Sequence, residues 1–444
     1  MSGRGKQEMS RRASAPLASA GLFAAFAGLA FFAPLPASAA DLGGDCCADL
    51  EERVAELEAT TARKGNRKVS LTVSGYIAQE ITVWDDGTES NVYIHGLGPT
   101  QASHVKFNGQ ATIAPGWTAG YMLRIQDLTG NAFAGGDNAI NQLNGSNNGN
   151  LNTQMSFWYL QSESLGKLSV GRLAHAAKSA GMFTDLSGTQ IIDNYTFLAG
   201  FPQFRLRTSS GELSSLTWGQ LGFCYTQGAP LGGDCNGIVM NGVRYDTPTF
   251  AGFSASASWG EDDFWELAAR YSGETAGCKV AAGVGYTSMT SETTSFLVPA
   301  DHKDSVFFQA GAYVQHLATG LFLHGIYGNE DNNGTALTSG RLEPDSDHYY
   351  VKAGIRRKVL PLGATIVYGD YARYNDQLGP AAINMGATSS TLERIGGGIA
   401  QEIDAAAMTV YLKYQHYQAD IDGISDLDNL EDADFVSFGG LINF

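Results

Sequence analysis

A regular alternation of apolar and polar residues begins at Val69 and returns in stretches as far as the last residue, Phe444. Successive side chains of a β-strand point to opposite faces, so a period of two predicts strands with one apolar and one polar face. Sixteen such stretches occur along the chain. After the first, their expected ranges are 103–113, 117–127, 153–163, 166–173, 238–247, 250–260, 264–273, 276–288, 305–316, 320–329, 347–357, 362–373, 391–402, 405–417 and 433–444.

The composition agrees with a large β-protein. The chain contains 55 glycines, 22 phenylalanines and 19 tyrosines but only 12 prolines, and these proportions are typical of antiparallel barrels and sandwiches. Beyond residue 40, no uncharged apolar run approaches the roughly 20 residues that a membrane-spanning helix needs. The formal net charge of −17 leaves no basic patch for nucleic acid. The sequence therefore argues against a helical membrane protein and against a nucleic-acid partner.

Every second connection between the predicted strands is short, and the others are long and polar. The short connections are 114–116, 247–248, 317–320 and 358–363, and the long ones are 128–152, 289–304, 330–346, 374–390 and 418–432. A barrel that crosses an outer membrane has short periplasmic turns at one end and long external loops at the other. The sequence therefore predicts an all-β fold, a transmembrane antiparallel β-barrel of sixteen strands with both chain ends in the periplasm.

Charged side chains in the predicted strands keep to one face. Lys106 and Arg124 alternate with apolar neighbours, and Arg270 and Lys352 follow the same rule on later strands. One face must therefore meet water while the other is apolar over the height of a bilayer. A barrel of sixteen to eighteen strands is wide enough to enclose an aqueous channel. A secreted β-sandwich adhesin is an alternative, and it would need no lipid-facing band.

Residues 1–39 have the features of a cleaved secretory signal peptide. A basic start is followed by an uncharged apolar stretch and by the small-residue site ASA at 37–39. Cleavage after Ala40 is the alternative. The segment therefore predicts export across the inner membrane.

Residues 40–68 are expected to form a periplasmic lead-in segment. Cys47, Leu50, Val54 and Leu57 follow heptad spacing among charged residues, which predicts a short amphipathic helix of the coiled-coil type. A solvated helix without a partner is the alternative, because a helix this short is marginal alone. The β-barrel then comprises residues 69–444.

Several segments resemble known outer-membrane proteins. DCCADLEERVAELEATTARKGNRKVSLTVSGYI, followed by WDDGTESNVY, resembles the amino-terminal region of the alphaproteobacterial outer-membrane porin family. GKLSVGR at 166–172, the segment 241–260 and the terminal Phe444 are similar to the general porin pattern. The resemblance implies a trimeric barrel that passes small hydrophilic solutes by passive diffusion, with the third external loop, here 174–237, folded inward as a constriction.

The inner part of that loop leaves the strand number open. Its segment QFRLRTSSGELSSLTWGQLGFCY has the pattern of a β-hairpin. If this hairpin belonged to the barrel wall, the barrel would have eighteen strands instead of sixteen.

The resemblance also suggests which residues line the constriction. Acidic groups on a loop that faces basic groups on the wall would produce a transverse field that orients polar solutes. The loop candidates are Asp185, Asp193 and Glu212, and the wall candidates are Lys106, Arg124, Arg244 and Arg172. Arg172 rests on the resemblance alone, because alternation places it on the lipid side. The net charge and the acidic external loops predict a weak preference for cations.

The remaining residues give little sign of other chemistry. Cys224 and Cys235 bracket a turn-rich segment and are candidates for a disulfide, whereas the pairing of Cys46, Cys47 and Cys278 stays open. The eight histidines are scattered without the spacing of metal ligands, so we expect no metal, no cofactor and no enzyme.

The expected partners are two further copies of this chain in a homotrimer, outer-membrane lipid and lipopolysaccharide, and small hydrophilic solutes and ions. A channel with a preferred substrate is one alternative. An outer-membrane hydrolase is another, and it would need a serine, a histidine and an acid or amide at the outer rim.

Overall fold

The computed structural model describes most of the chain beyond the lead-in segment. The described residues are 68–98, 100–127, 151–194, 203–237, 239–260, 264–291, 303–334, 336–337, 339–427 and 429–444. The predicted signal peptide and all of the lead-in segment except Lys68 lie outside them. Among the described residues, none of the helices has the length and apolar character needed to span a bilayer.

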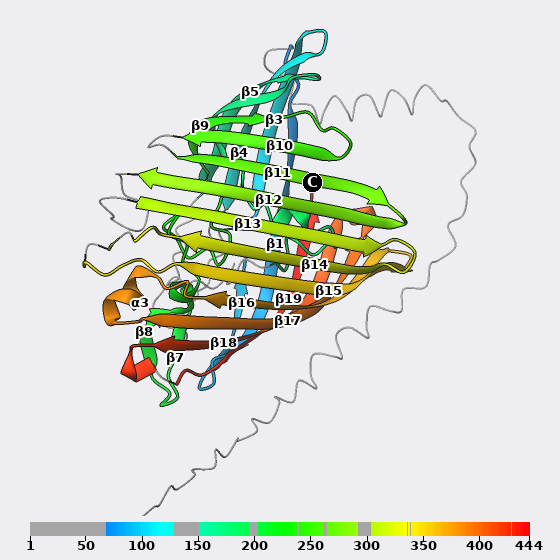
Figure 1. The fold of residues 1–444 in the computed structure, drawn as a ribbon. Coiled ribbons are helices and arrows are strands. Elements are labelled where there is room, and N and C mark those ends of the chain that lie inside the picture. Colours follow the sequence, from blue (N-terminus) through cyan, green and yellow to red (C-terminus); the bar gives the residue numbers. More distant parts are fainter. Residues whose placement is uncertain are drawn as a thin grey trace, which may run out of the picture. The chain divides into compact units, whose positions relative to one another are not determined.

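Sixteen strands form a closed antiparallel barrel (Figure 1). They are β1 (Thr72–Asp85), β3 (His104–Ala114), β4 (Trp117–Asp127), β5 (Leu151–Ser162), β6 (Gly166–Ala174), β9 (Val239–Asp246), β10 (Phe253–Gly260), β11 (Trp265–Thr275), β12 (Cys278–Ser291), β13 (Lys303–His316), β14 (Leu321–Asp331), β15 (Ser346–Leu360), β16 (Gly363–Asn375), β17 (Ser389–Ile403), β18 (Met408–Asp422) and β19 (Ala433–Asn443). Pairing of β1 with β19 closes the ring. The predicted sixteen-stranded barrel is confirmed.

One strand of the sheet was not expected from the sequence. β2 (Ser90–His95) pairs with the second half of β1, from Glu80 to Asp85, whereas β3 pairs with the first half, from Thr72 to Tyr76. β2 and β3 therefore share one side of β1. The sheet counts 17 strands, but the wall keeps sixteen positions.

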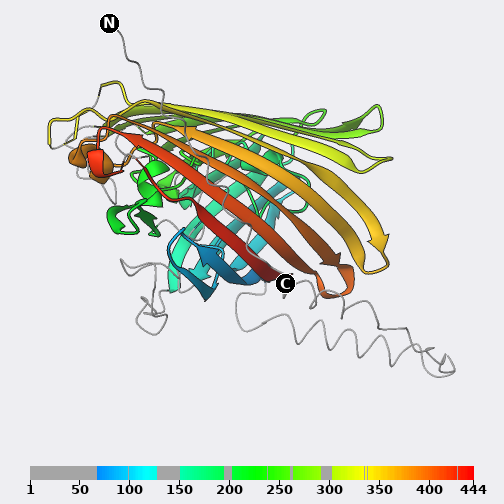
Figure 2. The ribbon, with the colours of Figure 1, turned by 90° about the horizontal axis from the view of Figure 1, so that it is seen from below.

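The predicted hairpin inside the loop is present, but outside the wall. β7 (Arg205–Arg207) and β8 (Leu213–Thr217) form a separate two-stranded sheet. They have 3 and 5 residues, whereas a strand that spans a bilayer needs roughly 9 to 11. The eighteen-stranded alternative is therefore wrong. Figure 2 shows this small sheet at the end of the barrel that carries α3 (Pro380–Met385).

The described helical turns are short and lie outside the barrel strands. They are η2 (Met182–Thr184), η3 (Trp218–Leu221), η4 (Asp404–Ala406) and η5 (Ser425–Leu427).

The tight turn between β11 and β12 shows why one end of the barrel has such short connections. Ala276 and Gly277 both have positive φ, at 49° and 74°, as in the two-residue hairpin turns that match the twist of paired strands.

The two faces of the wall differ as the alternation predicts. Val284 and Phe438 point outward with 43% and 40% of their surface exposed, whereas the inward neighbour Ala281 is buried. Apolar exposure of this kind along every strand requires a surrounding lipid phase. At the seam, Phe444 exchanges two backbone hydrogen bonds with Gly75, at 2.8 and 3.1 Å. The apolar last residue is therefore the end of the closing strand.

Candidate functional site: the lumen and its loop

Residues 174–237 connect β6 to β9, and several of their described residues bind inward-facing side chains of the barrel wall. The backbone N–H of Gly181 donates to Gln309 Oε1 of β13 at 2.7 Å. On the other side, Gln101 Nε2 of the β2–β3 connection lies 3.3 Å from Met182 Sδ. The loop therefore contacts both β13 and the β2–β3 connection.

A single wall carboxylate holds both ends of this loop. Glu266 of β11 is fully buried, and its two oxygens accept hydrogen bonds from the N–H groups of Ala177 and Gly237, each at 2.6 Å. Thr287 Oγ1 donates to the same carboxylate at 2.9 Å. Because Ala177 and Gly237 are close to the two ends of the loop, Glu266 fixes where the loop leaves and rejoins the wall.

Two further polar side chains, on the neighbouring strands β13 and β14, hold loop residues between those two ends. Besides binding Gly181, Gln309 donates from Nε2 to the carbonyl oxygen of Gly233 at 2.9 Å. Glu330 of β14 accepts hydrogen bonds from the N–H groups of Tyr225 and Thr226, at 3.0 and 2.8 Å. Each wall residue satisfies loop N–H or C=O groups that would otherwise be buried without partners.

A buried ion pair joins the loop to β15. Lys352 Nζ donates to Asp185 Oδ2 and to Thr189 Oγ1, both at 2.9 Å, and to the carbonyl oxygen of Asp193 at 2.6 Å. Burial alone would raise the pKa of the Asp185 carboxyl, but the Lys352 ammonium, His324 and the hydrogen bonds from Lys352 and Ser187 together outweigh burial and lower it. Lys352 was expected to meet water, and this was wrong because the loop covers its side chain completely.

A second network surrounds the other loop acid. Asp193 accepts hydrogen bonds from Arg394 at 3.2 Å, from the Tyr368 hydroxyl at 2.9 Å and from Gln415 at 3.0 Å. Arg394 also binds Asp370 of β16 and is itself buried. We call the wall from β12 to β18 the sealed half, because the loop packs against it through these buried groups.

Lys413 and Glu80 extend these contacts toward the seam of the barrel. Lys413 Nζ lies 3.0 Å from a Glu80 oxygen and donates to the carbonyl oxygen of Ile192 at 2.9 Å. Sequence reasoning missed Arg394 and Lys413 as partners of the loop, and it missed Asp370 and Glu80 as the wall acids that pair with them. Alternation places them on the inward face, but the loop residues that Arg394 and Lys413 bind, Asp193 and Ile192, are 201 and 221 residues away along the chain.

The remaining predicted loop acid lies elsewhere. Glu212 is in the exposed turn between β7 and β8, where its N–H group binds Thr208 Oγ1. Asp185 and Asp193 are bound to the sealed half. The structure therefore does not bring any of the three loop acids onto the wall that carries Arg124 and Arg244.

The predicted wall bases lie on the opposite side of the lumen. Lys106 of β3 and Arg124 of β4 are paired in register, and Arg124 and Arg244 line a cavity of about 370 Å³ together with Phe183 of the loop. Arg244 Nη1 donates to the carbonyl oxygens of Ala174 and His175, at 3.0 and 3.1 Å. We call the wall formed by β3–β6 and β9–β11 the open half.

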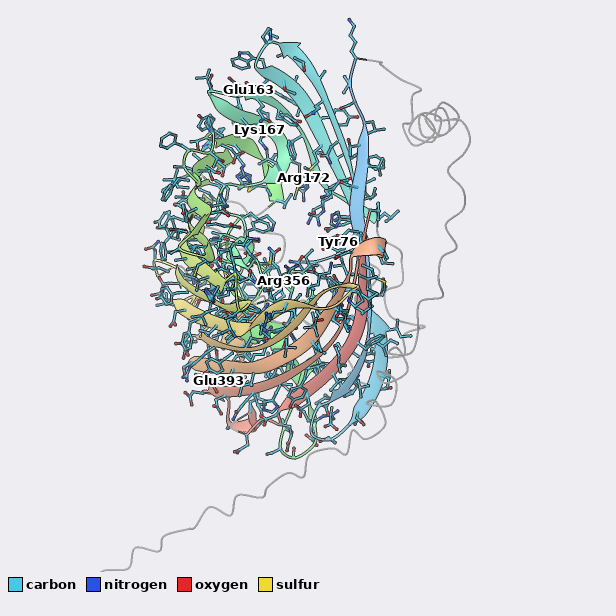
Figure 3. The ribbon with its side chains drawn as sticks, turned by 90° about the vertical axis from the view of Figure 1, so that its right-hand side faces the viewer. Tyr76, Glu163, Lys167, Arg172, Arg356 and Glu393 are labelled. Carbon is cyan, nitrogen blue, oxygen red and sulfur yellow. A yellow bond between two sulfur atoms is a disulfide. The ribbon has the colours of Figure 1, made fainter. Side chains whose placement is uncertain are left out.

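Arg172 is not part of this cavity. Its strand partner is Ser156, and its side chain is exposed while the next residue, Leu173, is buried. Arg172 therefore lies on the outer face of the barrel, as the alternation predicts. Figure 3 looks along the barrel, with Tyr76 and Arg356 bordering the central space and Glu393 at the outer edge.

A disulfide joins Cys224 and Cys235 within the loop, with an S–S distance of 2.02 Å. Both residues are fully buried and pack with Phe307 of β13. Cys278 is free, and Cys46 and Cys47 lie outside the described residues. The bridge closes the turn that Glu330 binds, so the wall contacts a covalently constrained segment.

Comparison with known proteins identifies the family. The model of the Gram-negative porin family matches residues 24–440. The chain belongs to this family. No curated protein sequence matches the chain. Among solved structures, it is similar to an anion-selective porin from Comamonas acidovorans, at 16% identity and a TM-score of 0.53 over 85% of this chain and 100% of that one.

A second solved structure supports the same fold. The outer membrane channel DcaP of Acinetobacter baumannii is similar at 12% identity and a TM-score of 0.50, over 86% of this chain and 100% of that one. At such low identities the likeness supports the barrel fold, and the family match supports the activity. The protein is therefore an outer-membrane porin, a channel for passive diffusion.

Proposed function

We propose that this porin passes small hydrophilic solutes and ions between the loop and the open half of its lumen. The observation that carries this proposal is the asymmetry of the loop. Its Asp185 and Asp193 are in ion pairs with the sealed half, whereas its Phe183 borders the cavity on the open half. Residues 174–237 then act as the constriction, with the wall candidates Lys106, Arg124 and Arg244 beside the path.

Purified protein in planar bilayers tests this function. We expect discrete conductance steps in potassium chloride, and swelling of proteoliposomes in small sugars that decreases with solute size. A protein that inserts as folded barrels but gives neither conductance steps nor swelling would contradict the proposal. Hydrolysis assays on ester and peptide substrates accompany these measurements, and we expect no activity above the background.

We further propose that the porin is a homotrimer, and Arg172 supports this assembly. Arg172 is six residues from the periplasmic start of β6, which corresponds to about 15 Å along the barrel axis. An arginine facing lipid near the middle of a bilayer costs about 2 to 4 kcal/mol. A neighbouring subunit that covers Arg172 would remove this cost. Three correlated closing steps in single-channel records are expected, and independent single steps would oppose the trimer.

The signal-peptide features of residues 1–39 and the resemblance of the amino-terminal region support two further proposals, one on export and one on the type of porin. Residues 1–39 direct export, so the amino terminus of the mature protein should be Ala40, or Asp41 if cleavage follows Ala40. The similarity of the stretch around residues 45–77 supports an alphaproteobacterial type of porin, with the coiled-coil-like helix as an accessory to the trimer. Deletion of residues 45–64 should leave trimers that dissociate at a somewhat lower temperature, and only monomers would mean that the helix is the main assembly element.

A further inference from the structure

The cavity on the open half is bordered by an excess of basic side chains. Arg124, Arg270 and Lys178 line it, and Lys106 is the strand partner of Arg124. Among the described residues, none of these four side chains has a carboxylate within ion-pair distance. Arg270 instead donates to the carbonyl oxygen of Ala176 at 2.7 Å, and Arg124 contacts His104 Nδ1 at 3.1 Å. None of these four charges is therefore held in an ion pair within the described structure.

One carboxylate does line this cavity, but it forms an ion pair with an arginine of the same lining. Asp246 Oδ1 lies 2.7 Å from Arg244 Nη2 and accepts from Ser256 Oγ at 2.7 Å. Its Oδ2 lies 3.9 Å from Lys167 Nζ. Asp246 and Arg244 together add no net charge. The lining therefore keeps the positive charge of Arg124, Arg270 and Lys178.

The loop supplies no acidic wall opposite these bases. Asp185 and Asp193 are buried on the far side of the loop, each in an ion pair with the sealed half. The side that faces the cavity presents Lys178 and Phe183. The described lining of the cavity therefore faces no acidic wall, and it carries a net positive charge.

These charges act on any solute in the cavity. A space of about 370 Å³ keeps every solute atom within a few ångströms of the lining, whereas the Debye length is about 8 Å at physiological ionic strength. A cleft lined by one sign of charge raises the local concentration of oppositely charged solutes. The net charge of the whole chain acts from greater distances and is screened more strongly.

We propose that this porin is anion-selective and that its preferred solutes are small molecules bearing a carboxylate, sulfate or phosphate group. This inference rests on the proposed path along the open half. Guanidinium groups bind such oxyanions through paired N–H donors, and Arg124 Nε is buried without a hydrogen-bond partner among the described residues. The preference reverses the weak cation selectivity that the net charge of −17 suggests.

Reversal potentials across a potassium chloride gradient test the sign of selectivity. The full-length mature porin should show a chloride-to-potassium permeability ratio above one. The ratio should approach one as salt rises from 0.1 to 1 M, because the Debye length falls from about 10 Å to about 3 Å. Conductance with a ratio of one or below at 0.1 M would overturn the anion proposal and leave the channel function intact. Absence of conductance would instead refute the proposed function itself.

A pair of charge-matched variants locates the selectivity. Lys106→Gln with Lys178→Gln removes two charges near the cavity without breaking any ion pair in the described structure. Arg341→Gln with Arg357→Gln removes two exposed charges that do not line the cavity. The first pair should lower the permeability ratio by about twofold or more, and the second should leave it unchanged. Equal effects of the two pairs would overturn the assignment of selectivity to this cavity.

Inorganic phosphate supplies a second readout. Added to one side at low salt, it should reduce the chloride current of the unaltered porin, and this reduction should be weaker in the Lys106→Gln and Lys178→Gln variant. Trimers resistant to detergent at room temperature confirm that each variant is folded before it is measured. Identical phosphate effects in the variant and the unaltered porin would contradict oxyanion binding here.

Discussion

The two halves of the lumen use charged residues for different purposes. On the sealed half, Lys352 and Arg394 are fully buried and form ion pairs with acids of the loop. On the open half, Arg124 and Arg270 are partly exposed and have no carboxylate partner among the described residues. Both sets follow the same alternation in the sequence. Inward position therefore does not distinguish a charge that holds the loop from a charge that meets solute.

Breaking a network of the sealed half should have the largest effect. Arg394→Leu would leave Asp193 and Asp370 buried without their cation, at a cost of about 3 to 5 kcal/mol. We expect the loop to detach, with higher single-channel conductance and a lower urea midpoint of unfolding.

Arg373→Leu is the matched control for that change. Arg373 pairs with Glu393 at 3.0 Å, but these side chains are 37% and 31% exposed on the outer face. The loss of unfolding free energy in this variant should therefore not exceed about 1 kcal/mol. If both variants lost the same stability, the distinction between buried and exposed pairs would fail.

The second prediction concerns where the wall tolerates a charge. Val284→Arg places a cation in lipid and should cost about 2 to 4 kcal/mol. Ala281→Arg faces the lumen but lies under the loop, with Ala281 4% exposed, so it should also be strongly destabilising. Asn108→Arg on the open half should cost little. Urea unfolding in detergent compares the three, and easy tolerance at position 281 would mean that the loop does not cover β12.

Acid should weaken the loop where it leaves β6. His175 is buried there, and burial lowers its pKa to about 4, below its value near 6.5 in the unfolded chain. The neutral form is therefore favoured in the folded state, so stability is complete above pH 6.5 and is lost as the pH falls toward 4. The maximal loss is about 3 kcal/mol. His175→Phe should flatten this part of the pH profile of unfolding, and an unchanged profile would assign the acid sensitivity to other groups.

Glu266→Gln should give the smallest of these effects. The amide keeps one oxygen acceptor but turns an NH₂ group toward the N–H of Ala177 or Gly237, at a cost of about 1 to 3 kcal/mol. Excess current noise from loop movement is expected with little change in trimer stability. Glu274→Gln, at an exposed position of the same strand, is the control and should leave the noise unchanged.

The barrel was predictable from the sequence, whereas the arrangement inside it was not. Alternation depends on local geometry, so it predicted the strands, their faces and the outward position of Arg172. The strand β2 was not predicted because its six residues contain too few alternations to indicate a strand. Asp185 and Asp193 were expected to face the pore, but the side of a loop is set by partners such as Lys352 and Arg394, which lie 167 and 201 residues away. No local pattern contains that information.

In this account, the open half faces the pore while the loop covers the sealed half. Water access to the two halves tests this claim most directly. Asn108→Cys places a thiol on the inward face of the open half, and Ala400→Cys places one on β17 of the sealed half, where Ala400 is 1% exposed. Both are made with Cys46, Cys47 and Cys278 replaced by serine. A small water-soluble thiol reagent should label position 108 rapidly and reduce the current, while position 400 should react only after unfolding. Equal labelling rates in the folded porin would show that both halves face the pore and would contradict this account.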